Sequence, residues 1–161
     1  AQKNRVVEAP AVIFEDQDDL ITGFKKGELN KDFIAVVRFQ GPKAKGMPEL
    51  HKLTPTLSIL QHNGFKVALV TDGRMSGASG KVPSAIHVSP EAMDGGLWPL
   101  LKDGDLLKLD CNSGELTCLN EEEVIQRDQQ FFPEKEEGCG RELFDKVRSL
   151  ITSSETGASI F

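Results

Sequence analysis

The chain has little of what marks membrane, secreted and nucleic-acid-binding proteins. No apolar run approaches the roughly 18–20 residues of a membrane-spanning helix, and the first five residues lack the apolar core of a signal peptide. Lys and Arg number 19 against 25 Asp and Glu, which gives a formal charge of −6, and no stretch concentrates basic residues as a nucleic-acid-binding surface does. We therefore expect a cytoplasmic protein whose partners are neither membranes nor nucleic acids.

Cysteine is also scarce. Cys111, Cys118 and Cys139 are too few and too widely spaced for a disulfide framework, and no CxxC pair indicates a zinc site. We expect all three to be reduced thiols. The 161 residues are 39% hydrophobic, which is enough to bury the core of one compact domain.

Apolar runs and turn residues predict an α/β domain. Residues 32–39 and 65–70 are apolar without alternation, which is typical of strands buried on both faces. Helices are expected at 18–26 and at 48–63, the second broken or split in two by Pro55 and closed by Gly64. We expect a mixed sheet that curls into a barrel, with flanking helices.

The second half of the chain carries weaker signals. Residues 85–88 suit a short strand, Ser89-Pro90 resembles a helix start, and an Asn-Ser-Gly turn predicts a hairpin of residues 105–110 and 115–119. Asn120-Glu121-Glu122-Glu123 is expected to cap a helix. A last helix is predicted over 141–153, and its expected apolar face consists of Leu143, Phe144, Val147, Leu150 and Ile151.

The first candidate site is the loop at residues 70–81, which follows an apolar strand. Gly73, Gly77 and Gly80 allow close approach of a ligand, while Ser76, Ser79 and Lys81 supply hydroxyls and a cation suited to an oxyanion. The spacing matches neither a P-loop nor a dinucleotide fingerprint. On these residues alone, the loop is either an anion-binding site or a plain Gly/Ser turn.

The second candidate is the Gly/Pro-rich loop at residues 38–50. It ends at Glu49, whose carboxylate suits either a hard divalent cation or a favourable charge at a helix start. His51, His62 and His87 are isolated in the sequence, so a histidine metal site is not expected.

Together these loops carry a resemblance. Leu69-Val70-Thr71-Asp72-Gly73-Arg74-Met75-Ser76-Gly77-Ala78-Ser79 resembles the C-terminal signature of the dehydratases that comprise dihydroxy-acid dehydratase and 6-phosphogluconate dehydratase. The resemblance extends to Gly41-Pro42, to Gly46-Met47-Pro48-Glu49 and to His87-Val88-Ser89-Pro90-Glu91-Ala92, and so covers most of residues 33–109. Residues 79–87 are most similar to the 6-phosphogluconate branch.

The resemblance implies a hydro-lyase of the Entner-Doudoroff pathway, which converts 6-phospho-D-gluconate to 2-dehydro-3-deoxy-6-phosphogluconate. It implies Ser76 as the base and Glu49 as a ligand of Mg²⁺. Further residues are assigned more loosely, as contacts to the substrate or as groups that orient the loop. The substrate contacts are Arg74, Gly77, Ser79 and Lys81, and the orienting residues are Asp72 and His87.

The family also uses an iron-sulfur cluster, held by cysteines of a larger N-terminal domain. Nothing in this chain resembles those motifs, and its three cysteines lie outside the matched segments. The resemblance therefore implies that residues 1–161 are a single C-terminal, swivelling β-barrel-like domain whose partners are that N-terminal domain, a small sugar-acid phosphate and a second copy in a homodimer. Two alternatives stay open: a dihydroxy-acid or other sugar-acid dehydratase domain, and a non-catalytic anion-binding module.

Overall fold

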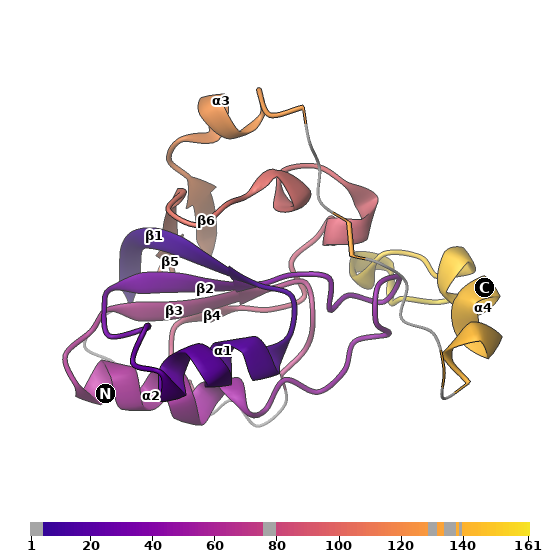
Figure 1. The fold of residues 1–161 in the computed structure, drawn as a ribbon. Coiled ribbons are helices and arrows are strands. Elements are labelled where there is room, and N and C mark those ends of the chain that lie inside the picture. The colour runs from indigo at the N-terminus through magenta and orange to yellow at the C-terminus, as the bar shows by residue number, and fades with distance from the viewer. Residues whose placement is uncertain (1–4, 76–79, 129–131, 134–137, 139) are drawn as a thin grey trace.

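The computed structural model describes residues 5–75, 80–128, 132–133, 138 and 140–161. Its six strands form one sheet in the order β4-β3-β2-β1-β5-β6 (Figure 1). The strands are β1 (Val6–Phe14), β2 (Phe33–Val37), β3 (Val67–Thr71), β4 (Ser84–Ala85), β5 (Leu106–Asp110) and β6 (Glu115–Cys118). The α-helices are α1 (Gln17–Lys25), α2 (Leu53–His62), α3 (Glu121–Val124) and α4 (Asp145–Leu150).

The sheet is mixed, and β1 is the strand at which it curls. Strands β1 to β4 run parallel to one another, whereas β5 is antiparallel to both β1 and β6. Residues Val6 to Pro10 of β1 pair with β5, and residues Ala11 to Phe14 pair with β2. Because β1 exchanges its partner just after Pro10, which has no amide hydrogen to donate, the sheet turns there into a half-barrel. The expected α/β class with a mixed, curled sheet and flanking helices is confirmed.

Two apolar layers bury the sheet on both faces. Side chains alternate along β2, so that Phe33, Ala35 and Val37 face α1 and α2, while Ile34 and Val36 face the opposite side. That opposite side is covered by residues 92–101 and by the β5–β6 hairpin. Burial on both faces explains why β2 and β3 are continuous apolar runs, as the sequence predicted.

Several expected elements differ in detail. Pro55 does not break α2, because it lies in the first turn, where an amide hydrogen would have no intrahelical acceptor. The short strand is Ser84–Ala85 instead of 85–88. Ser89-Pro90 does not start a helix: a 3-10 turn begins later, at Ala92, with Glu91 before it. Gly64 does follow α2 in the left-handed conformation, with φ of 98°.

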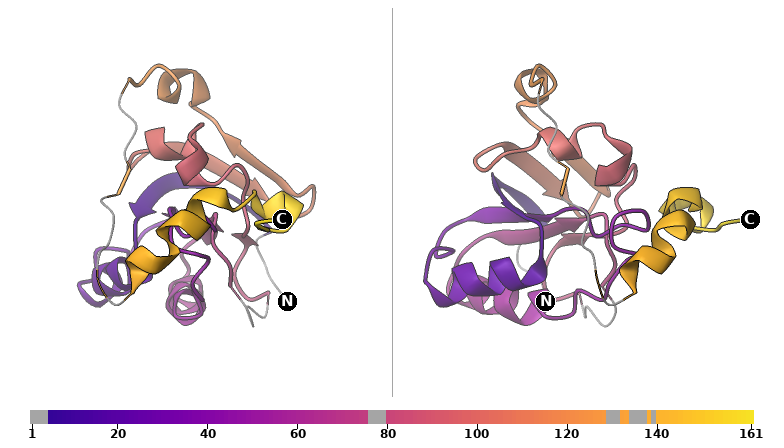
Figure 2. Two further views of the ribbon diagram at one scale, coloured as in Figure 1. Left: turned by 90° about the vertical axis from the view of Figure 1, so that its right-hand side faces the viewer. Right: turned by 45° about the vertical axis from the view of Figure 1, so that its right-hand side comes forward.

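The C-terminal helix also differs from the prediction. Residues 141–153 form a 3-10 turn, Arg141–Phe144, followed by the short α4. This segment lies beyond the carboxyl ends of the parallel strands and beside the main body (Figure 2). The expected apolar face is not buried: Leu143 is 80% exposed and Leu150 is 67% exposed. Periodicity predicted a helix here, but most of its apolar face stays exposed among the described residues.

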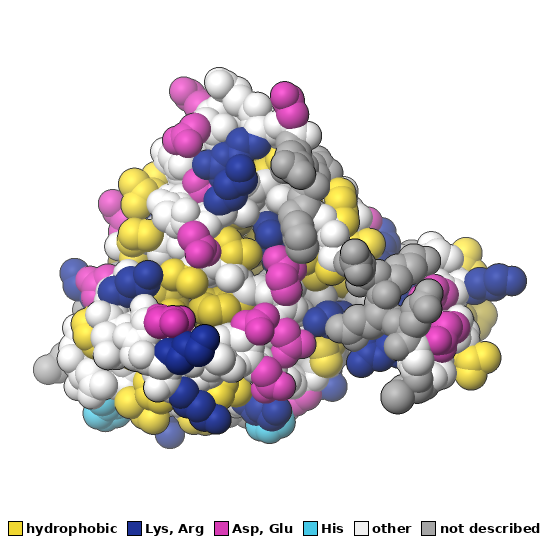
Figure 3. Space-filling model, in the orientation of Figure 1, with side chains coloured by type: hydrophobic (Ala, Val, Ile, Leu, Met, Phe, Trp, Pro, Cys, Tyr) yellow, Lys and Arg dark blue, Asp and Glu magenta, His cyan; other side chains and the backbone are white. Residues whose placement is uncertain are grey.

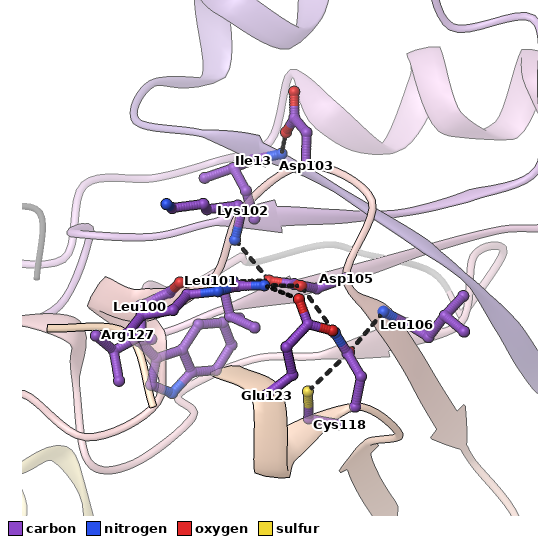
Figure 4. Close-up of polar contacts among 12 residues, drawn as sticks. Ile13, Leu100, Leu101, Lys102, Asp103, Asp105, Leu106, Cys118, Glu123 and Arg127 are labelled. Atoms are coloured by element: carbon purple, nitrogen blue, oxygen red, sulfur yellow. Dashed lines mark hydrogen bonds and ion pairs between the residues drawn. The ribbon is translucent and has the colours of Figure 1, made fainter. Parts of the chain in front are cut away.

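An ion pair ties the segment after α3 to the residue before β5. Nη1 and Nη2 of Arg127 each lie 2.7 Å from an oxygen of the Asp105 carboxylate, which is buried (Figure 4). Asn120 donates to the same carboxylate at 3.0 Å and accepts from the Leu106 amide. Asn120 precedes α3 as predicted, but its side chain joins this network and makes no capping hydrogen bond. Burial alone would raise the pKa of Asp105, but Arg127 and the other donors outweigh it and lower that pKa.

None of the helices in the described part of the chain is both long enough and apolar enough to cross a membrane.

Candidate functional site

The two candidate loops meet at the carboxyl ends of β2 and β3. Because these strands are parallel neighbours, the segments that leave them emerge at the same edge of the sheet. Glu49 and Arg74 pair there through their backbones as an isolated parallel bridge, and the Leu50 amide donates to the Arg74 carbonyl at 3.3 Å. The fold therefore joins the loop ending at Glu49 to the start of the signature loop.

The side chains of Glu49 and Arg74 form an ion pair. Arg74 Nη1 lies 3.0 Å from Glu49 Oε2, and Arg74 Nε donates to the Met47 carbonyl at 2.7 Å. Glu49 is three-quarters buried, with 25% of its side chain exposed, whereas Arg74 is 47% exposed. The expected metal ligand and one of the expected substrate contacts are thus direct neighbours.

Asp72 precedes Arg74 by two residues and is fully buried. Its carboxylate accepts from the Gln40 amide at 2.9 Å and from the Ala92 amide at 3.0 Å. Burial raises the pKa of Asp72, although the amides that donate to it act in the opposite direction. Asp72 therefore connects the end of β2 to the start of the 3-10 turn at Ala92, a geometry that suits the orienting role expected of it.

Glu91 holds the backbone of the loop after β2, as Asp72 does, by accepting hydrogen bonds from amides. It is buried, and its Oε1 accepts from the amides of Lys43 and Ala44 at 3.0 and 3.2 Å. Burial is the main cause that raises the pKa of Glu91, and the neighbouring carboxylate of Asp72 adds to it. Sequence reasoning assigned Glu91 no function, and its only signal was its place in the His87-to-Ala92 motif.

Arg38 is a second residue that sequence reasoning missed. It is buried at the end of β2, where Nε lies 2.8 Å from Glu15 Oε1 and Nη1 donates to the carbonyls of Trp98 and Leu101. A buried guanidinium with these partners fixes the β1–α1 corner against residues 98–101. The sequence signal that could have identified Arg38 is its position as a basic residue inside an apolar strand.

The remaining expected residues are placed as follows. Lys81 and His87 are exposed; His87 has φ of 55°, and its amide donates to the Gly73 carbonyl at 2.9 Å. Ser76, Gly77 and Ser79 lie outside the described residues, as does Cys139. Gly73 itself requires glycine, because a Cβ there would lie 2.6 Å from Gln40 Cβ.

The described residues fit a magnesium ion only in part. Glu49 offers carboxylate oxygens, the ligand type that Mg²⁺ prefers. Within the described ranges, however, no group of three or more His, Cys, Asp or Glu side chains converges as a metal site. Glu49 can therefore supply one ligand to Mg²⁺, but the described residues do not supply a complete set of protein ligands.

The described residues do not fit an iron-sulfur cluster. Cys118 is buried in β6, at the opposite edge of the sheet from β3 and β4, and Cys111 is exposed in the turn before β6. Burial raises the pKa of the Cys118 thiol, which disfavours the thiolate that ligates iron.

Comparisons with known proteins show which family the chain belongs to. The family model described as dihydroxy-acid/6-phosphogluconate dehydratase C-terminal matches residues 1–158. The chain belongs to this family.

Individual relatives are similar along almost the whole chain. A phosphogluconate dehydratase of Pseudomonas aeruginosa is 58% identical over 100% of this chain and 27% of its own length, and that of Zymomonas mobilis is 57% identical over 94% and 25%. A dihydroxy-acid dehydratase of Wolinella succinogenes is 38% identical over 97% of this chain and 28% of its own length. The chain thus spans about a quarter of the length of these relatives.

Proposed function

We propose that this chain is the C-terminal catalytic domain of a longer hydro-lyase that dehydrates 6-phospho-D-gluconate to 2-dehydro-3-deoxy-6-phosphogluconate. The observation that carries the proposal is the joining of Glu49 to Arg74, which brings the Gly-Met-Pro-Glu loop and the signature loop to one edge of the sheet. The higher identity to relatives named phosphogluconate dehydratase supports this substrate over a dihydroxy acid.

The reaction removes a proton from C2 and a hydroxyl from C3 of the sugar acid, and the resulting enol becomes the 2-keto acid. In the proposal, Ser76 takes the C2 proton. A serine hydroxyl is too weak an acid to ionise unaided near neutral pH, so its alkoxide requires a nearby cation and amide donors. Arg74 precedes Ser76 by two residues in the sequence and Lys81 follows it by five, so the signature loop carries two cations.

Glu49 would hold Mg²⁺, which when bound supplies a Lewis acid for the substrate's carboxylate. Arg74 fixes the orientation of Glu49 through the ion pair and fixes the loop through the Met47 carbonyl. Asp72 and Glu91 hold the backbone of residues 40–44 in place, so that the loop ending at Glu49 is built before ligand binds.

The remaining parts of the proposal concern the longer protein. An iron-sulfur cluster would be held by cysteines of an N-terminal domain, because the described cysteines of this chain do not suit it. The longer protein would be a homodimer and cytoplasmic, as the family resemblance implies.

The test is an anaerobic assay of the full-length protein with 6-phosphogluconate and, separately, with a 2,3-dihydroxy acid that lacks phosphate. Formation of 2-keto acid from the phosphorylated substrate alone is expected. Turnover of the other substrate alone would move the protein to the dihydroxy-acid branch, and turnover of neither would favour a binding module.

In the same protein, Ser76→Ala is expected to abolish dehydration while the absorbance of the cluster is kept; substantial residual activity would refute Ser76 as the base.

A further inference from the structure

A cleft of about 680 Å³ lies beside the loop that ends at Glu49, and Pro48 is part of its lining. Three segments that are distant in the sequence form its walls: the β1–α1 corner at residues 15–17, the loop after β2 at residues 39–48, and the C-terminal segment at residues 141–149. Gln17, in the wall of the cleft, donates to the Glu49 carbonyl at 3.4 Å. The cleft therefore borders the loop that carries Glu49.

Cations are concentrated in this cleft although the chain is acidic overall. Figure 3 shows basic and acidic side chains close together where the main body meets the C-terminal segment. The cations that line the cleft are Lys43, Lys45, Arg141 and Arg148, and the carboxylates are Glu15, Asp16 and Asp145. Four positive and three negative side chains thus line the cleft, whereas the whole chain carries −6.

Three of the cations in this cleft form ion pairs with carboxylates. Lys45 Nζ lies 3.2 Å from Asp16, Lys43 pairs with Asp94, and Arg148 pairs with Asp145. These pairs are partly exposed, and such pairs contribute little net stability. A phosphate carries a charge of about −1.5 to −2 and offers several acceptor oxygens, so it can recruit these donors.

Two buried acceptors in the same cleft lack hydrogen bonds. Glu15 Oε2 and Gln17 Oε1 are buried and have no hydrogen-bond partner among the described residues. A buried oxygen without a donor is costly, and a hydroxyl of a ligand would satisfy it. Phosphate oxygens alone cannot do so, because they are acceptors. The cleft therefore combines donors for an anion with acceptors for hydroxyls.

We propose that this cleft binds the phosphate end of a phosphorylated sugar acid and its adjoining hydroxyls, while the carboxylate end lies at the Glu49–Arg74 pair. Lys43 and Arg148 bind the phosphate, and Glu15 and Gln17 accept from the hydroxyls. This inference rests on the proposed function and adds to it the residues that distinguish a phosphorylated from an unphosphorylated substrate.

The test uses the full-length enzyme and the variants Lys43→Gln and Arg148→Gln. Each is expected to raise the KM for 6-phosphogluconate at least about tenfold, with a smaller change in kcat, because each removes a charged hydrogen bond to the phosphate. Each should also weaken competitive inhibition by inorganic phosphate. The matched control is Lys66→Gln, which removes one positive charge at the amino end of β3 and should change neither quantity.

A third variant, Gln17→Met, tests the binding of the hydroxyls separately from the binding of the phosphate. It should raise the KM for 6-phosphogluconate while inhibition by inorganic phosphate stays as in the wild type, since phosphate alone has no hydroxyl for Gln17. Weaker inhibition in this variant would refute the separate hydroxyl-binding role.

Two other outcomes count against the inference. If both cation variants keep the wild-type KM and the wild-type inhibition by phosphate, or lose kcat alone, the cleft does not bind the phosphate although the proposed function stands. If the wild type does not turn over 6-phosphogluconate at all, the proposed function fails first, and this inference fails with it.

Discussion

Arg74 Nη1 lies 3.0 Å from Glu49 Oε2, and the same two residues also pair through their backbones. This double connection joins the end of one loop to the start of the other. A displacement of either loop therefore moves both the expected metal ligand and the chain that leads into Ser76. The site is held together by the neighbouring positions of β2 and β3 in the sheet.

The first prediction concerns Glu49. In the full-length enzyme, Glu49→Gln should raise the Mg²⁺ concentration needed for half-maximal activity at least about tenfold, because a neutral amide replaces a charged oxygen ligand. Titration of activity with Mg²⁺ measures this. Glu122→Gln, which neutralises an exposed carboxylate on α3, is the control. An unchanged Mg²⁺ dependence in Glu49→Gln would argue that Glu49 serves only to orient Arg74.

The sequence was sufficient to predict β2, β3, the β5–β6 hairpin and the two loops, because these depend on local patterns, but it did not predict β1. Strands β2 and β3 are apolar on both faces, and the hairpin at β5 and β6 has a strong turn signal. The tail is the contrary case. The spacing of its apolar residues predicted a helix, but this spacing carries no information on what the helix packs against. Leu143 and Leu150 are in fact exposed.

The sequence identified which residues belong to the candidate site, but it did not predict how they are arranged in space. Glu49 and Arg74 were both expected to act, yet their ion pair depends on strand order, which neither loop encodes locally. Arg38 and Glu91 were missed for a related reason. Each is a charged residue that is buried because its partners are backbone groups distant in the chain, and those partners are known only from the fold.

The second prediction concerns Gly41, which packs against Glu91. A Cβ at Gly41 would lie 2.7 Å from Glu91 Oε2 and 2.9 Å from Glu91 Cβ, so Gly41→Ala must displace the side chain that holds Lys43 and Ala44. We expect the free energy of unfolding to fall by about 1–3 kcal/mol, as for other overpacked sites. Urea unfolding measures the change.

Gly23→Ala is the matched control for this substitution. Gly23 lies within α1, and a Cβ there would meet only Leu29 and Glu28 side-chain atoms, at 3.5 Å or more. Alanine should therefore raise the free energy of unfolding by about 0.5–1 kcal/mol through its higher helix propensity. Equal effects of the two substitutions would show that the contact with Glu91 is unimportant.

The third prediction concerns the ion pair of Arg127 and Asp105. Arg127→Met leaves the buried Asp105 carboxylate without its cation, and we expect a loss of about 2–3 kcal/mol of unfolding free energy. Lys52→Met removes the partner of Asp18 in an exposed pair and should cost less than about 1 kcal/mol. Similar losses in both variants, again by urea unfolding, would contradict a special role for the buried pair.

The last prediction is a pH dependence at Glu91. Burial raises the pKa of Glu91 above 4.5 in the folded chain, so its ionised form is disfavoured there relative to the unfolded chain. Stability is therefore lost as the pH rises through 4.5 to the raised pKa, and it is regained as the pH falls through the same window. In Glu91→Gln this titration is absent, and the amide oxygen can still accept from Lys43 and Ala44. Asp72 and Asp94, the carboxylates that face Glu91, are present in both proteins.

On lowering the pH from about 7 towards the ordinary pKa of glutamate, the unfolding free energy of the wild type should thus rise relative to that of Glu91→Gln. Urea unfolding at a series of pH values measures this difference. A difference that is constant with pH would mean that Glu91 ionises in the folded chain as readily as in the unfolded one, and that its amide donors fully offset its burial.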